Sequence, residues 1–151
     1  WILKTKAEKS SSKESMISSP AFRGRGAACL VLVYRPAMLE RRLRDPAVRA
    51  FLRAQGYVED SLEGYLSQLG RRLEESAEFP HEIGLFLDYP LEDVQGFMAN
   101  RGAGAVCQGC WKAYGDAQEA YRRFRLYGKC REVYLSCYRR GFDVLRLTVA
   151  A

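Results

Sequence analysis

The only histidine of the chain, His81, stands beside Glu82 and just ahead of the dense apolar run IGLFL. A histidine with a carboxylate neighbour can act as a general base, because its pKa lies near neutrality and shifts with partial burial. We therefore take His81 as a candidate catalytic base and Glu82 as the carboxylate that orients it. The pair is not a zinc-protease motif, since HExxH needs a second histidine where this chain has Leu85. The interpretation we favour is structural, with His81 hydrogen-bonded at the start of the following segment.

The block WKAYGD, residues 111–116, is the second candidate. A lysine flanked by aromatic side chains can hold a phosphate or a carboxylate, and a helix that begins at the aspartate adds its dipole. The candidate ligand-binding residues are Trp111, Lys112, Tyr114 and Asp116. In the alternative that the sequence favours, Trp111 belongs to the core and Asp116 caps a helix. Lys112 then buries its aliphatic part and exposes its ammonium group to water.

The cysteines predict no metal site. Cys107 and Cys110 have the CxxC spacing of zinc and thiol–disulfide sites. On the last helix Cys130 and Cys137 lie two turns apart, roughly 10 Å, too far to share one zinc ion through Zn–S bonds of about 2.3 Å. Most of the cysteines are therefore interpreted as small buried side chains, with a redox or metal role as the alternative. No glycine-rich nucleotide-binding loop is present, so the sequence identifies no cofactor.

Length and composition indicate one globular domain without a membrane segment. The chain has 151 residues, 48% of them hydrophobic and 28% charged, which is ordinary for a soluble domain. Its longest apolar run, AACLVLVY at 27–34, is too short to cross a bilayer. We expect no secretion signal and no disulfide framework among the five cysteines, and hence a cytoplasmic location.

The net charge of +6 is unevenly spread. Residues 1–26 carry six basic and two acidic side chains, whereas residues 27–151 carry 18 and 16. The first 26 residues lack periodicity and are rich in serine and lysine, so we expect an irregular basic segment there, followed by one globular domain at 27–151. Nucleic-acid binding through this segment and the last helix is the least favoured function, because no recognisable nucleic-acid motif accompanies the charge.

The pattern of apolar residues predicts a mixed α/β domain that is rich in helix. The expected order is β-α-α-α-β-α-β-α, with a small sheet of about three strands covered by helices. The strands are expected at 27–34, 79–89 and 106–114. The middle strand, the helix that begins at Pro90 and the last strand could form a right-handed parallel crossover. A helix over 81–88 is the alternative, since a short apolar run is ambiguous.

Capping signals place the helices. Asp45 stands before Pro46, and Ser61 and Asp116 stand before periodic runs, so each is expected to be an N-cap. The first helix is expected from Pro36 through the segment AMLERRL. In the last helix, residues recurring at three and four predict a long buried face made by Ala117, Ala120, Phe124, Tyr127, Cys130, Tyr134 and Cys137.

Four blocks together resemble a known family. VLVYRPAMLERRLRDPAVRAFLRAQGY, FPHEIGLFLDYPLEDVQGFM, CWKAYGDAQEAYRRFRLYGKC and LRLTVAA are similar to bacterial domain-of-unknown-function family 3793, over roughly residues 27–151. The resemblance implies a small bacterial cytoplasmic protein and carries over no functional residue. Members usually have a longer N-terminal part, which would supply strands before VLVYRP and which residues 1–26 match poorly. Several members have tyrosine in place of Cys110, so the resemblance supports no family-wide role for the CxxC pair.

Three functions follow from these residues, in decreasing order of preference. The first is a non-catalytic binding or regulatory module whose ligand is an unknown small molecule or a protein partner. A homodimer through an unpaired sheet edge is one form of it. The second is a small-molecule enzyme in which His81 is the base and Lys112 binds an anionic group. The third is nucleic-acid binding.

Overall fold

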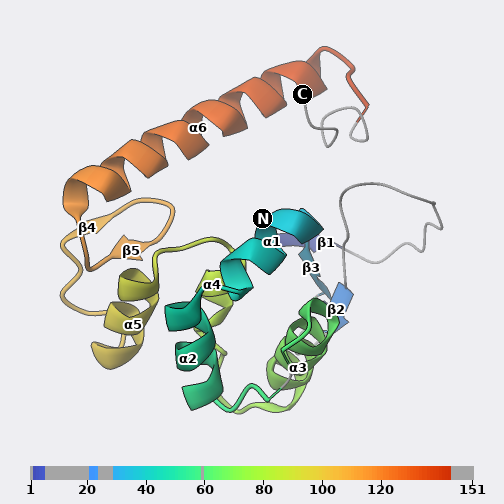
Figure 1. Ribbon diagram of the computed structural model, residues 1–151. Coiled ribbons are helices and arrows are strands. Elements are labelled where there is room, and N and C mark those ends of the chain that lie inside the picture. Colours follow the sequence, from blue (N-terminus) through green and yellow to red (C-terminus); the bar gives the residue numbers. More distant parts are fainter. Residues whose placement is uncertain (1, 6–20, 24–28, 59, 144–151) are drawn as a thin grey trace. The chain divides into compact units, whose positions relative to one another are not determined.

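The computed structural model describes residues 2–5, 21–23, 29–58 and 60–143 (Figure 1). The chain divides into two compact units, Trp1–Leu91 and Glu92–Ala151. Helices make up most of both units, with short antiparallel sheets beside them. The predicted mixed, helix-rich class is therefore confirmed, whereas the single sheet of about three strands is wrong.

The sheet of the first unit has β3 (Cys29–Leu32) at its centre. β1 (Ile2–Thr5) and β2 (Ala21–Arg23) pair with it on either side, both antiparallel. The first predicted strand is thus confirmed. It has neighbours on both sides, so the outer edges of this sheet are formed by β1 and β2. Two strands lie within 1–26, where we expected an irregular segment, and the rest of that segment is outside the described residues.

Three helices of the first unit follow their sequence signals. They are α1 (Pro36–Leu43), α2 (Pro46–Ala54) and α3 (Leu62–Glu75). The carboxylate of Asp45 accepts hydrogen bonds from two backbone N–H groups of α2, and the hydroxyl of Ser61 accepts one from α3. Both predicted N-caps are confirmed. The capped ends fix where each helix begins, because they satisfy backbone donors that have no partner inside the helix.

The strand predicted at 79–89 is wrong. That stretch forms turns around a single helical turn, α4 (Ile83–Phe86), and Asp88 adopts a left-handed φ of 62°. All four residues of α4 are buried. A segment that is buried all round shows neither the period of a strand nor that of an amphipathic helix, which is why the sequence left both possible.

The core of the first unit is apolar and draws on every helix. It is formed by Leu32, Leu39, Leu43, Val48, Leu52, Tyr57, Tyr65, Leu66, Leu69, Leu73, Ile83, Leu85 and Phe86. Only a few polar residues join it, and Glu82 is among them.

The second unit consists of α5 (Leu91–Ala99), a β-hairpin and α6 (Ala117–Arg139). The hairpin pairs β4 (Cys107–Gln108) with β5 (Lys112–Ala113) in antiparallel fashion. The single strand predicted over 106–114 is therefore wrong, and so is the parallel crossover. The chain reverses within three residues, starting at Gly109, a glycine that the strand prediction did not weigh as a turn.

The long helix α6 is capped as predicted but buried far less than predicted. Its N-cap is Asp116, and its C-terminal end closes through Gly141 with a φ of 83°. Of the expected apolar face only Ala120 is buried, while Phe124 and Tyr127 are half-buried beside the hairpin. Tyr134 is exposed. The helix runs about 34 Å at 1.5 Å per residue, and the short hairpin contacts only its first half. No helix in the described part of the chain combines the length and apolarity needed to cross a membrane.

Two helical glycines provide a matched test of the packing in the second unit. A Cβ added at Gly96 of α5 would overlap the Cβ and Cγ atoms of Tyr114, whereas one added at Gly128 of α6 would meet nothing within 4 Å. Alanine favours a helix over glycine by about 1 kcal/mol. We expect Gly128→Ala to raise the melting temperature by about 2–4 °C. We expect Gly96→Ala to lower it, because overpacking costs about 1–3 kcal/mol. Thermal unfolding of both variants checks this, and a stabilised Gly96→Ala would contradict the packing.

Candidate functional site

The polar centre of the first unit is the carboxylate of Glu82, whose side chain is only 1% exposed. Arg72 Nε donates to Glu82 Oε1 over 2.6 Å, and the hydroxyl of Tyr57 donates to the same oxygen over 3.2 Å. Arg72 Nη1 also donates to the carbonyl of Gln55, and its guanidinium lies 5.5 Å from the centre of the Tyr57 ring. These contacts tie α3 to α4 and to the segment that follows α2.

This centre resembles a structural ion pair more than a reaction site. Burial of Tyr57, followed by the nearby charge of Glu82, raises the pKa of that phenol. His81 is exposed and its ring centre lies 5.7 Å from that of Phe79. The two neighbours in the candidate catalytic pair thus have opposite environments, one in the core and one at the surface.

The polar centre of the second unit is Asp93, which the sequence analysis did not single out. Its Oδ2 accepts from Trp111 Nε1 over 2.7 Å, and its Oδ1 accepts from the backbone N–H groups of Tyr114 and Gly115 over 2.6 and 2.9 Å. One buried carboxylate therefore fastens α5 to the hairpin. The signal was available in the sequence, because a buried tryptophan requires an acceptor for its N–H group.

The other candidate ligand-binding residues are also held by their own unit. Lys112 Nζ donates to the carbonyl of Gly102 over 2.7 Å, and Asp116 accepts from two N–H groups of α6. The hydroxyl of Tyr114 is buried without a hydrogen-bond partner among the described residues. The structure places His81 and Glu82 in the first unit and Trp111, Lys112, Tyr114 and Asp116 in the second. A shared pocket that includes His81 and Lys112 stays a prediction.

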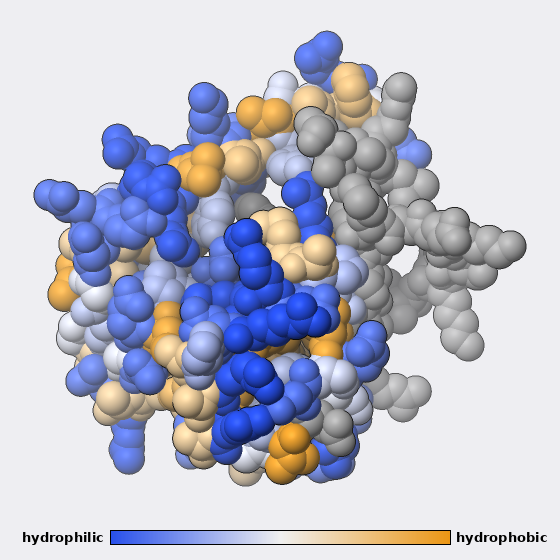
Figure 2. Space-filling view, in the orientation of Figure 1, coloured by the Kyte–Doolittle hydropathy of each residue, from blue (hydrophilic) through white to orange (hydrophobic). Residues whose placement is uncertain are grey.

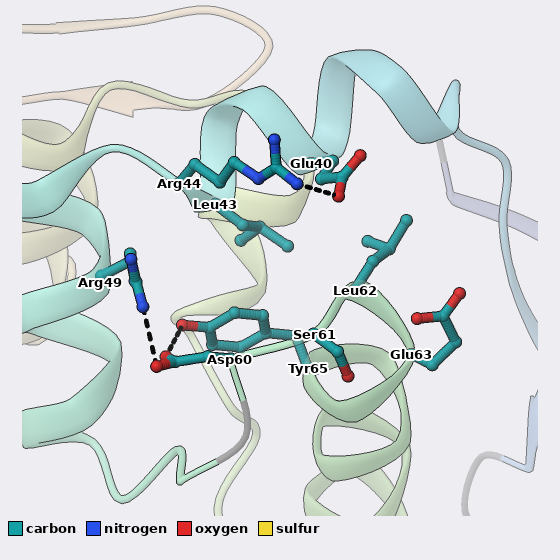
Figure 3. Close-up of a pocket in the computed structure, with 9 residues that line it drawn as sticks. All are labelled: Glu40, Leu43, Arg44, Arg49, Asp60, Ser61, Leu62, Glu63 and Tyr65. Carbon is teal, nitrogen blue, oxygen red and sulfur yellow. Dashed lines mark hydrogen bonds and ion pairs between the residues drawn. The ribbon is translucent and has the colours of Figure 1, made fainter.

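A hollow of about 490 Å³ lies on the first unit (Figure 3). Figure 3 shows Arg44 directed at Glu40, while Arg49 and Tyr65 are directed at Asp60. Burial raises the pKa of the Asp60 carboxyl, but hydrogen bonds from Arg53 and Arg49 outweigh it and lower that pKa overall. Four of the five charged side chains that line the hollow are thus paired with one another, and Glu63 is the fifth.

The cysteines whose side chains the structure describes differ in their surroundings. Cys107 is buried and Cys110 exposed, while Cys130 and Cys137 are half-buried free thiols on α6. The interpretation as small buried side chains therefore holds for Cys107 and is wrong for Cys110. Within the described ranges, no three histidine, cysteine or carboxylate side chains come together as metal ligands.

The second half of α6 carries the most unusual surface of the second unit. From Leu126 onward, apolar side chains recur at three and four, and four of them are between 44% and 60% exposed. We call this surface the α6 stripe; its residues are Leu126, Cys130, Val133, Tyr134, Cys137 and Tyr138. Figure 2 shows hydrophobic patches along α6 between hydrophilic side chains. Exposed apolar side chains in a row are unusual on a protein surface and mark binding sites.

One comparison with known proteins decides the relationship of this chain. The family model described as "Protein of unknown function (DUF3793)" matches residues 3–148. The chain belongs to this family. The DUF3793 match confirms the resemblance seen in the sequence. It begins at residue 3 and so extends further toward the N-terminus than the resemblance over roughly residues 27–151. No curated protein and no solved structure matches the chain.

The ion pair in this DUF3793 protein can be tested by removing its partners one at a time. Arg72→Met leaves the buried carboxylate of Glu82 without its cation, so we expect the free energy of unfolding to fall by about 2–4 kcal/mol. The double variant Arg72→Met/Glu82→Gln should recover part of that loss, because it also removes the buried charge. Urea unfolding measures both. An Arg72→Met variant as stable as the wild type would show that the pair does not hold α3 to α4.

Proposed function

We propose that this DUF3793 protein is a non-catalytic binding module that binds another protein through the α6 stripe. The observation that carries the proposal is the exposure of the stripe, with Tyr138 60% and Val133 53% exposed. Apolar side chains held in water on a helix cost free energy in the isolated chain, and a partner that covers them recovers about 25 cal/mol for each Å². Tyrosine is also a residue type enriched in protein interfaces.

The environment of the candidate catalytic residues supports a binding role over an enzymatic one. The carboxylate of Glu82 accepts hydrogen bonds from Arg72 and Tyr57, and Lys112 donates one to a backbone carbonyl. A catalytic base needs its orienting carboxylate beside it and an open approach for substrate. His81 is exposed, whereas Glu82 is buried and accepts from Arg72 and Tyr57. The small-molecule enzyme with His81 as base stays a prediction, without a specific observation in its favour.

A cytoplasmic location is part of the proposal. Cys107, Cys110, Cys130 and Cys137 are free thiols, and thiols persist in a reducing compartment.

Replacing the stripe tyrosines tests the proposal. The double variant Tyr134→Ser/Tyr138→Ser should unfold at nearly the same temperature as the wild type, since exposed substitutions change stability by no more than about 0.5 kcal/mol each. A library of helical peptides, selected on the wild-type chain and depleted on this variant, should yield peptides that bind the wild type alone. Binding of those peptides is then measured by fluorescence anisotropy.

The control is Tyr121→Ser, which replaces another exposed tyrosine of α6. Tyr121 shares its face with Arg125 and Glu132 rather than with the stripe, as the spacing of four and eleven residues requires. This variant should keep full binding. A stripe variant that unfolds several degrees earlier would contradict the proposal, because the tyrosines would then support the fold. Selected peptides that bind both chains equally would contradict it as well.

A further inference from the structure

Residues 121–140 of the second unit carry an excess of positive charge, as residues 1–26 do. Residues 121–140 contain seven basic side chains and one acidic side chain, Glu132. Subtracting these from the totals of 24 basic and 18 acidic residues leaves 17 of each sign in the rest of the chain. The net charge of residues 121–140, which is +6, therefore equals the net charge of the whole chain.

The charges nearest the stripe flank it on both sides. Lys129 lies three residues after Leu126 and four before Val133, so it borders one edge. Arg140 borders the same edge, three residues after Cys137. Arg131 borders the other edge, three residues before Tyr134.

These flanking cations are available to a partner. Lys129, Arg131 and Arg140 are exposed. None of them forms an ion pair with a carboxylate of the described residues. Glu119, in the first turn of α6, forms ion pairs with Arg122 and Arg123 instead. Arg140 lies over the ring of Phe142, 5.5 Å from its centre, which leaves its charge at the surface.

We propose that the partner segment bound by the α6 stripe is an acidic amphipathic helix, which rests on the function proposed above. The stripe runs straight along residues 126–138, about 18 Å of helix. Apolar side chains at spacings of three, four and seven fit the apolar face of a second helix. A β-strand is a poorer occupant, because the backbone N–H and C=O groups of α6 bond within the helix and offer no edge to pair with.

Charge disfavours a second copy of the chain. Such a copy would bring its own Lys129, Arg131 and Arg140 against the same residues, and like charges across an interface oppose association. An anionic lipid surface would attract the same cations, so binding to vesicles is measured alongside the peptides. In a protein partner, carboxylates that flank the apolar positions would instead pair with these cations. Such pairs chiefly speed association and fix register, while the apolar contacts slow dissociation.

The test uses two labelled peptides of about three heptads. Both carry leucine at the apolar positions; one has glutamate and the other lysine at the flanking positions. Fluorescence anisotropy on the full chain should give the glutamate peptide about tenfold or greater advantage at about 0.1 M salt. The advantage should shrink severalfold at about 0.5 M salt, because screening shortens the reach of surface charges.

A pair of charge variants locates the effect. Lys129→Glu/Arg131→Glu/Arg140→Glu should abolish or reverse the preference. The matched control Arg41→Glu/Arg71→Glu/Arg101→Glu changes the net charge equally at exposed residues outside the α6 sequence and should leave the preference intact. If the control loses the preference as fully as the α6 variant, overall charge and not the stripe attracts the peptide, and the proposal is overturned.

Other results would overturn the acidic helix as the occupant. Equal affinity for the two peptides, with loss of both in Tyr134→Ser/Tyr138→Ser, would keep the binding function and remove the charge preference. A stripe-dependent dimer in sedimentation would identify a second copy instead. Tighter stripe-dependent binding to vesicles containing phosphatidylglycerol, or to duplex DNA, would identify a membrane or a nucleic acid. Failure of every probe, together with a peptide selection that yields no stripe-dependent binder, would remove the binding function itself.

Discussion

A carboxylate that leaves water must be given hydrogen-bond donors by the protein, and this constraint organises each unit of the chain. Glu82 is buried in the first unit and receives Arg72 and Tyr57. Asp93 is buried in the second unit and accepts hydrogen bonds from Trp111 and from two backbone N–H groups. Because the donors come from segments distant in sequence, satisfying each carboxylate brings those segments together. Polar residues that suggest chemistry in the sequence thus act as points of attachment in the fold.

The surface of α6 follows from the attachment made by Asp93. With Trp111 held by that carboxylate, its ring packs against Phe124 and Tyr127 of α6, at centre distances of 4.5 and 6.0 Å. The hairpin is only a few residues long, so it packs on the first half of a 23-residue helix, while Tyr134 and Tyr138 of the second half are exposed. The apolar period continues past the covered half without interruption. A helix that binds a partner needs apolar side chains beyond those that pack within its own chain, and α6 has them.

The sequence predicted those elements whose signals are local. Asp45, Ser61 and Asp116 begin their helices as expected, because a cap depends on residues two or three positions away. It failed over 79–89 and 106–114, where the apolar runs carry no helical or strand period and long-range burial decides. It also assigned Cys130 and Tyr134 to a buried face, since periodicity shows that a face is apolar but not what covers it. Asp93 was missed because its partners lie about twenty residues away.

The central claim, that the α6 stripe is bare in the free protein and covered by an acidic helix, is tested most directly by hydroxyl-radical footprinting with mass spectrometry. In the free chain, Tyr134 and Tyr138 should oxidise readily, while Tyr57 and Tyr65, 1% and 2% exposed, should not. Adding the glutamate peptide should protect Tyr134 and Tyr138 and leave Tyr121 on the opposite face reactive. Stripe tyrosines that resist oxidation in the free chain, or protection that extends equally to Tyr121, would contradict the account.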